Sequence, residues 1–264
     1  MVREGSCKGL GVVQGMHDKA QATFNDFNNK MYRLRSDVLT GLGGLHHVCH
    51  LLIGKVPVML LYVDSHYASP YAMSVFVALH EKQLPFKTTT LDLSSGAARN
   101  PAYAKLSLTH RVPTLIDDGF SLSESSAITE YLDETYTGQA LYPAEVKNRA
   151  RVRQVQAWLR SDFMPIRSER TTVVLFYGPS ATPLSAEAQG AAQKLFAGAT
   201  ELLSHGGPHL CGKEWCISDV DLAVMLNRLV LNGDAVPEHL AAYATRQWQR
   251  PSVQLWVNQK RPPL

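Results

Sequence analysis

Residues 58–93 read VMLLYVDSHYASPYAMSVFVALHEKQLPFKTTTLDL and contain three successive patterns. The apolar run at 58–63 is typical of a buried strand. Residues 69–83 predict an amphipathic helix, with Ser69 at the N-cap and a proline at the first helical position. The threonine-rich alternation at 85–93 predicts a second strand. A strand, a helix and a strand at this spacing indicate a parallel crossover unit.

The following residues extend this unit into an α/β domain. Residues 100–108 predict a short helix, and residues 111–125 predict two strands joined by a turn at the sequence DDG. Another helix is expected at 125–136. The element order is therefore βαβαββα, and we expect this domain to cover residues 58–138.

Strand patterns almost disappear after a hinge at YTGQALYP, residues 136–143. We expect an all-helical domain over residues 142–264. Its helical segments are predicted at 144–170, 185–204, 218–233, 236–249 and 251–259. The apolar stretch TVVLFYG at 172–178 is the exception, and it is consistent with either a loop or a short helix.

Residues 1–57 differ from the rest of the chain. They are polar, glycine-rich in places and weakly periodic, which predicts a poorly ordered or non-native extension before a natural beginning near Met59. His46 and His50 are one helical turn apart, a spacing that can hold a metal ion. No third ligand with suitable spacing follows them, so we expect solvated histidines and no metal.

The composition limits the classes of partner. The chain has 264 residues, of which 45% are hydrophobic, and a formal net charge of +3. This balance gives no strong field for nucleic acid or for a membrane surface, and we expect neither as a partner. The four cysteines are too few and too scattered for a disulfide scaffold, and they indicate buried or idle thiols in a reducing cytoplasm. They are Cys7, Cys49, Cys211 and Cys216.

Ser69 is the first candidate for chemistry. Open parallel sheets bind ligands beyond the carboxyl ends of their strands, and Ser69 lies there, at a helix N-terminus that favours negative charge. A hydroxyl donating a hydrogen bond to a thiolate at this place would lower the pKa of the thiol. The alternative is a serine that only caps the helix, because serine–proline helix starts are common.

Two further segments are candidates for ligand contacts. Val112 and Pro113 would leave backbone groups free for an extended ligand if the proline were cis, whereas an ordinary trans-proline at an edge strand is the alternative. In the stretch SESSAI, Ser125 at a helix start can bind a carboxylate, and Glu124 can receive an ammonium group. An N-cap beside an exposed glutamate is the simpler interpretation of that stretch.

Over residues 58–264 the order and spacing of these motifs resemble the glutathione S-transferase superfamily. The resemblance is carried by SPY at the first helix, RVPTL before the hairpin, ESSAITEYL at the third helix, and WCISDVDLA in the second domain. QAWLRSDFMPIR and RPSVQLWV are similar to the bacterial branch that uses a serine at the first helix. In WCISDVDLA we expect Ser218 and Asp221 to form a capping box.

The resemblance implies a thioredoxin-like glutathione-binding domain followed by the helical domain, and a role for each matching position. Ser69 matches the serine that stabilises the glutathione thiolate, with Tyr67 as the second candidate. Val112 matches the residue whose backbone pairs with the tripeptide, and Pro113 matches the cis-proline beside it. Glutathione is further expected to contact Glu124 and Ser125 at its γ-glutamyl end and Arg111 near its glycyl carboxylate. The sequence SLTH at 107–110 departs from the pattern of the family at that glycyl end.

The implied activity is attack of the glutathione thiolate on a small electrophile or peroxide, with roles in detoxification and oxidative stress. An apolar cosubstrate is expected between the domains, near Trp158, Phe163 and Met164. Glutathione-dependent peroxide reduction, isomerisation or dehalogenation is an alternative on the same scaffold, as is a non-catalytic binding or stress protein. The family also implies a cytoplasmic homodimer, with glutathione as the cosubstrate and no metal.

Overall fold

The strands form one mixed four-stranded sheet. A computed structural model describes residues 58–264, so the expected extension at 1–57, with His46 and His50, lies outside the described residues. The sheet has the order β2-β1-β3-β4, in which β1 and β2 are parallel and the other neighbours are antiparallel. Its strands are β1 (Met59–Asp64), β2 (Phe86–Leu91), β3 (Thr114–Asp117) and β4 (Phe120–Ser123).

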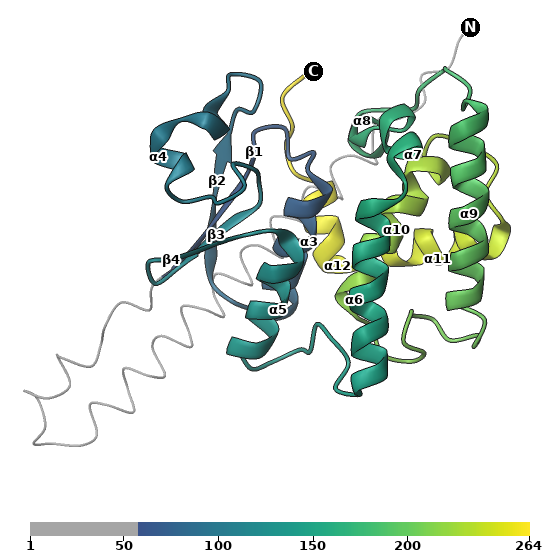
Figure 1. Ribbon diagram of the computed structural model, residues 1–264, viewed down its shortest axis with the longest axis horizontal. Helices are drawn as coiled ribbons and strands as arrows, with labels where there is room; N and C mark the ends of the chain where they lie inside the picture. The colour runs from purple at the N-terminus through teal and green to yellow at the C-terminus, as the bar shows by residue number, and fades with distance from the viewer. Residues whose placement is uncertain (1–57) are drawn as a thin grey trace, which may run out of the picture. The chain divides into compact units, whose positions relative to one another are not determined.

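Helices α3 (Pro70–Glu81) and α5 (Ser125–Thr135) lie between the sheet and the helices that follow α5 in the chain (Figure 1). The connection from β2 to β3 carries a short 3-10 turn, Ala97–Arg99, and α4 (Pro101–Ala104). The order βαβαββα predicted from the sequence is confirmed, including the turn between β3 and β4 at Gly119, whose φ of +83° needs the left-handed region that glycine tolerates.

Helix α3 is buried almost all round. Ser69 caps it and Pro70 occupies its first turn, as the sequence predicts, and every residue from Ala72 to Leu79 is buried. An apolar stripe on one side would be enough for a helix on the surface of a sheet. Burial on all sides fits a helix that contacts the sheet on one side and the helical part on the other.

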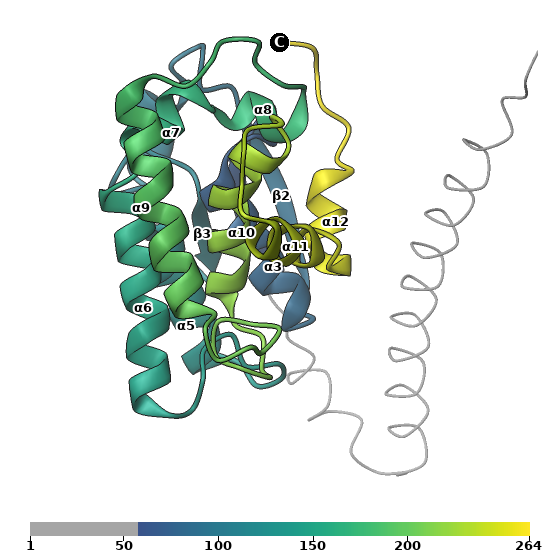
Figure 2. The ribbon, with the colours of Figure 1, turned by 90° about the vertical axis from the view of Figure 1, so that its right-hand side faces the viewer.

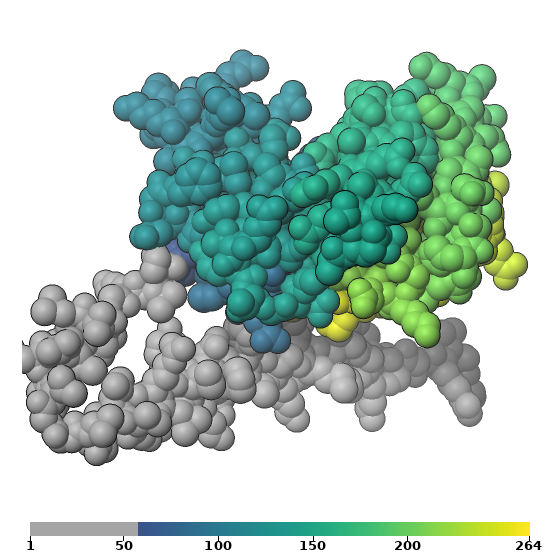
Figure 3. All heavy atoms as spheres, turned by 60° about the horizontal axis from the view of Figure 1, so that its bottom comes forward, coloured from purple at the N-terminus to yellow at the C-terminus, as the bar shows by residue number. Residues whose placement is uncertain are grey.

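The helical part surrounds α10 (Ile217–Val230), which is buried along nearly its whole length. Figure 2 shows α10 in the middle, with α6 and α9 on one side and α11 and α12 on the other. On the face in Figure 3 the teal side chains of residues near 130–160 meet the green side chains of the later helices. The other helices are α6 (Val146–Ser161), α7 (Met164–Glu169), α8 (Thr172–Phe176), α9 (Ala186–Leu202), α11 (Glu238–Trp248) and α12 (Pro251–Val257).

The first difference from the sequence prediction concerns one helical segment. The helical segment expected at 144–170 is two helices, because α6 ends at Ser161 and α7 begins anew at Met164 with Pro165 in its first turn. Asp162 marks the break, where its carboxylate accepts the indole N–H of Trp158 at 2.8 Å. The apolar stretch that follows forms the short helix α8.

The expected capping box at Ser218 and Asp221 is wrong. Helix α10 begins earlier than expected, with Cys216 at the N-cap, and Asp219 accepts the backbone N–H of Cys216 at 2.8 Å. Ser218 already lies within the first turn and donates instead to the carbonyl of Val152 at 3.0 Å. Asp219 is fully buried and also accepts hydrogen bonds from the backbone of Leu210 and the hydroxyl of Tyr243.

Candidate active site

Three chain segments meet at one end of the sheet. The register pairs Tyr62 of β1 with Thr114 of β3, and Thr114 with Ser123 of β4. Because both pairings are antiparallel, the carboxyl ends of β1 and β4 lie beside the amino end of β3. The loop that leads to Ser69, the segment before Thr114 and the start of α5 are therefore neighbours.

Ser69 is held at the N-terminus of α3 from two sides. Its Oγ accepts the backbone N–H of Ala72 at 3.2 Å. Its own backbone N–H donates to Oδ1 of Asp64 at 2.9 Å, and the N–H of Ala68 donates to Oδ2 of Asp64 at 2.8 Å. Asp64 is only 6% exposed, and its carboxylate thereby fixes the whole loop between β1 and α3.

Ser69 also lines an open cleft of about 740 Å³. Arg111 and Val112 line the same cleft, so the structure brings these three predicted site residues together. The sequence did not single out Arg99, a second basic residue in this wall. The remaining lining residues are Leu93, Ser94, Gly96, Ala98, Thr109 and His110.

The segment before β3 is fixed by side chains on its far side. The carbonyl of Arg111 accepts hydrogen bonds from the hydroxyls of Tyr103 at 2.8 Å and Ser107 at 3.1 Å. The peptide bond between Val112 and Pro113 is cis. Within residues 58–264, no hydrogen bond uses the backbone of Val112, which lines the cleft.

Glu124 and Ser125 lie at the same end of the sheet but outside the lining of that cleft. Glu124 is the N-cap of α5 and has a φ of +75°, which is unusual for a residue with a side chain. Left-handed backbone in such residues is often retained at functional sites. Glu124 is exposed, whereas Ser125 is buried in the first turn of α5.

Tyr67, the second candidate for the thiolate partner, points elsewhere. Its ring packs edge-on against Trp256 at 5.5 Å between centroids, and its carbonyl accepts a hydrogen bond from Arg261 at 3.1 Å. It is not among the residues that line the cleft with Ser69.

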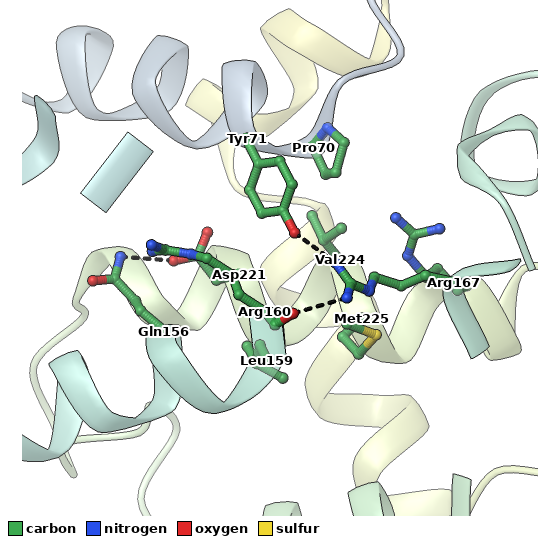
Figure 4. A pocket seen from close by; sticks show the side chains of 10 residues that line it. Pro70, Tyr71, Gln156, Leu159, Arg160, Arg167, Asp221, Val224 and Met225 are labelled. Carbon is green, nitrogen blue, oxygen red and sulfur yellow. Dashed lines mark hydrogen bonds between the residues drawn. The ribbon is translucent and has the colours of Figure 1, made fainter. Parts of the chain in front are cut away.

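A second, narrow cleft separates α3 from the helical part (Figure 4). Tyr71, next but one after Ser69, lines it, and its hydroxyl accepts a hydrogen bond from Arg167 at 2.9 Å. Figure 4 shows the two side chains pointing toward one another. The other lining residues are Pro70 from α3, Gln156, Leu159 and Arg160 from α6, and Asp221, Val224, Met225 and Arg228 from α10.

The aromatic and apolar residues that the sequence suggested for a cosubstrate do not line this cleft. The indole of Trp158 packs against the ring of Phe163, and Phe163 is part of the buried core. Met164 is 54% exposed to solvent. The cleft is lined instead by three arginines that the sequence did not indicate, Arg160, Arg167 and Arg228.

Two other findings concern the residues that the structure describes. No group of three or more potential metal-ligating side chains comes together anywhere in residues 58–264. Over the same residues, no helix combines the length and the apolar character that crossing a membrane requires.

Comparisons with known proteins agree on one family. Residues 68–135 match the model of the glutathione S-transferase N-terminal domain, and residues 145–260 match that of the C-terminal domain. A glutathione S-transferase of Pseudomonas putida is 31% identical over 68% of this chain and 82% of its own. A probable maleylacetoacetate isomerase of Vibrio cholerae is 28% identical, over 72% of this chain and 88% of its own.

A solved structure adds a likeness in three dimensions. It is a glutathione transferase homologue from Burkholderia gl BGR1 with bound glutathione, and it is 47% identical to this chain. The superposition has a TM-score of 0.63 and covers 75% of this chain and 96% of the other. With both domain models matched in order and a thioredoxin-like sheet followed by helices, this chain belongs to the glutathione S-transferase family.

Proposed function

We propose that this protein is a glutathione transferase of the bacterial serine type, in which Ser69 stabilises the glutathione thiolate. The observation that carries the proposal is the position of the Ser69 hydroxyl, at the N-terminus of a buried helix and in the wall of an open cleft. The relatives named glutathione S-transferase, and the homologue with bound glutathione, support the choice of ligand.

The two roles of Ser69 are compatible. A serine hydroxyl has one donor proton and two acceptor lone pairs. Accepting the N–H of Ala72 uses a lone pair and leaves the O–H free to donate to sulfur. That hydrogen bond and the positive end of α3 both favour the anion, so the thiol ionises at a pH below its usual pKa of about 8.5.

The remaining candidates hold the tripeptide in place. The backbone of Val112 pairs with the cysteine of glutathione along the strand edge. Glu124 receives the ammonium group, and Ser125 at the start of α5 receives the γ-glutamyl carboxylate. Arg111 approaches the glycyl carboxylate. Positioned in this way, the sulfur forms a bond to an electrophilic carbon while the leaving group departs with its electron pair.

A second candidate reaction uses the same bound thiolate. Maleylacetoacetate isomerases among the relatives favour an isomerisation in which glutathione adds to the substrate and leaves again. Peroxide reduction and dehalogenation are further reactions of this kind. Steady-state assays with a panel of halides, enones and hydroperoxides distinguish these reactions, and failure to bind immobilised glutathione would instead indicate a non-catalytic protein.

Ser69→Ala tests the role of the hydroxyl. We expect the pKa of bound glutathione, followed by the ultraviolet absorbance of the thiolate, to rise toward that of the free thiol. We also expect kcat/KM for conjugation to fall by about tenfold or more. Unchanged conjugation with an unchanged thiol pKa would reject the role of Ser69.

Ser185→Ala is the matched control, because Ser185 caps α9 through an identical 3.2 Å bond from the backbone of Ala188. Both variants lose about 1 kcal/mol of capping energy, and Ser185→Ala also loses the bond from the Ser185 hydroxyl to Glu169, but only the change at Ser69 is expected to alter the thiol pKa. Tyr67→Phe tests the second candidate for the hydroxyl that stabilises the thiolate. A larger loss of activity in Tyr67→Phe than in Ser69→Ala would assign that role to Tyr67.

We further propose a glutathione-binding domain at 58–138, a helical domain at 142–264, and a cytoplasmic homodimer. Sedimentation that shows a monomer at micromolar concentration would reject the dimer.

A further inference from the structure

The cleft between α3 and the helical part contains three guanidinium groups. Arg160, Arg167 and Arg228 line it together with Tyr71, and they come from three different helices, α6, α7 and α10 (Figure 4). None of the three forms an ion pair with any side chain in residues 58–264. The cleft therefore carries a concentration of positive charge that the described chain leaves unbalanced.

The only carboxyl group in the lining does little to offset this charge. Asp221 accepts a hydrogen bond from the amide of Gln156 at 2.9 Å rather than from an arginine. Burial raises the pKa of the Asp221 carboxyl, with opposing contributions from Gln156 and the Arg160 charge. Even a fully ionised Asp221 would leave two of the three positive charges unmatched.

Arg228 shows that this charge is built into the fold. The residue is only 4% exposed, and one of its guanidinium nitrogens, Nη1, donates to the carbonyl of Arg170 at 2.6 Å. Its Nε is buried and has no partner within residues 58–264, and the same is true of the Nε of Arg167. Burial lowers the pKa of Arg228 to about 10, with smaller effects of Tyr71, which raises it, and of Arg167, which lowers it further. Buried charge without a counter-ion is costly, so a bound anion would remove a standing penalty.

The basic cleft begins at the two residues that follow Ser69 in the chain. Ser69 lies in the wall of the open cleft, and Pro70 and Tyr71, the next two residues, lie in the wall of the basic one. Arg167 is oriented there by its bonds to the hydroxyl of Tyr71 and to the carbonyl of Arg160, at 2.9 and 2.8 Å. The cleft has about 30 Å³ of space for water, enough for a small charged group but not for a large ring.

We propose that the cosubstrate is an electrophile bearing a carboxylate, which enters this basic cleft while its reactive carbon remains beside the sulfur near Ser69. The proposal rests on the proposed function, and it replaces the apolar cosubstrate expected from the sequence. Guanidinium groups suit a carboxylate because their paired N–H donors match its two oxygens.

A matched pair of aromatic substrates tests the proposal. A chloronitrobenzoate and the corresponding chloronitrobenzamide both form a carbon–sulfur bond with the thiolate of glutathione and release chloride with its electron pair. They differ in charge but little in shape. For each, kcat/KM is divided by the rate constant of the uncatalysed reaction with glutathione, and the ratio of acid to amide measures charge selectivity.

We expect the wild-type protein to prefer the carboxylate, and Arg167→Met and Arg160→Met each to lower the acid-to-amide ratio by about tenfold or more. Arg151→Met is the matched control, because Arg151 is an exposed arginine on the same helix as Arg160 and outside the cleft. Its ratio should equal that of the wild type. Testing two arginines separately keeps the experiment decisive if one variant fails to fold.

Three results would overturn the proposal. The first is a wild-type protein without preference for the acid, and the second is a ratio that neither arginine variant changes. The third is a rise in KM for glutathione with an unchanged ratio, which would assign the arginines to the tripeptide. Turnover of the neutral amide by the wild-type protein, and its loss in Ser69→Ala, tests the proposed function separately.

Discussion

At the scale of single residues, the candidate site depends on a carboxylate that does not itself face the ligand cleft. Asp64 ends β1 and uses its two oxygens for two successive backbone N–H groups, those of Ala68 and Ser69. The direction of the Ser69 hydroxyl depends on that loop. A residue with no chemical role thus sets the geometry of the one proposed to act on the thiol.

Asp64→Asn removes one of these two acceptors. An amide has one oxygen, so its NH₂ group would face a backbone N–H, and one donor would lose its partner. We expect unfolding free energy to fall by about 1–3 kcal/mol and conjugation to weaken, as measured by urea titration and by kcat/KM.

Glu145→Gln is a suitable control, since Glu145 uses its two oxygens for two backbone N–H groups, those of Lys147 and Asn148, at an exposed position that lines neither cleft. If Asp64→Asn had the stability and activity of the wild-type protein, the loop would not need this carboxylate.

The sequence was informative about residues with a local signature. A serine followed by a proline is a local pattern that predicts the start of a helix, and in the structure α3 begins at Ser69 and Pro70 as predicted. Arg167 and Arg228 have no such signature, because their importance arises from contacts with residues distant in the chain. The carboxylate of Asp64 accepts bonds from Ala68 and Ser69 nearby, but its role depends on how the loop folds back, which no local residue pattern shows. The prediction of the cap of α10 was wrong for a different reason. Ser218 and Asp221 have the spacing of a capping box, but the N-cap is Cys216, a residue type that is rarely expected there.

At the scale of elements, α3 connects the two parts of the molecule, and its last turn contains a titratable group in apolar surroundings. His80 packs against the rings of Phe76 at 4.4 Å and Phe86 at 5.1 Å between centroids. Burial lowers its pKa to about 4, although the neighbouring Glu81 acts in the opposite direction. The folded protein therefore keeps His80 neutral at a pH where an unfolded chain would protonate it.

This difference gives acid sensitivity with a definite sign. Between about pH 6.5 and pH 4 the unfolded state binds a proton at His80 that the folded state does not, so stability falls as the pH is lowered through that window. We expect the free energy of unfolding to fall by roughly 2–3 kcal/mol less in His80→Phe than in the wild-type protein when the pH is lowered through this window. Urea unfolding at each pH measures this difference.

His239→Gln, at an exposed position of α11, is the control for removing a histidine elsewhere in the chain. Parallel pH profiles for His80→Phe and the wild-type protein would show that His80 does not cause the acid sensitivity.

Most elements were predictable because their patterns are short-range. The alternation of β2, the glycine turn after β3 and the apolar face of α6 are each visible within one segment. The break between α6 and α7 was not predicted. It depends on Asp162 turning back to the indole of Trp158 and on Pro165, which a helix tolerates in its first turn as well as at a kink.

At the scale of the whole molecule, the sheet part and the helical part are joined by a half-buried ion pair. Glu81 at the end of α3 accepts two bonds from the guanidinium of Arg250, at 2.7 and 2.6 Å, and another from the hydroxyl of Ser252. Arg250 in turn stacks on Trp215 at 4.0 Å. Because both clefts are bordered by α3, this connection fixes the helix against which glutathione and the cosubstrate are proposed to meet.

A double-mutant cycle measures how strongly this pair couples the two parts. Glu81→Ala and Arg250→Ala should each destabilise the protein, and the double variant should lose less than the sum, with a coupling energy of about 1–2 kcal/mol. The exposed pair of Glu130 and Arg153 also links the sheet part, through α5, to the helical part, through α6, so it provides the matched cycle. Its coupling should be much smaller, because solvent screens exposed charges and held side chains lose entropy. Equal coupling in the two cycles, measured by urea unfolding, would mean that burial at Glu81 contributes nothing to how the two parts are held together.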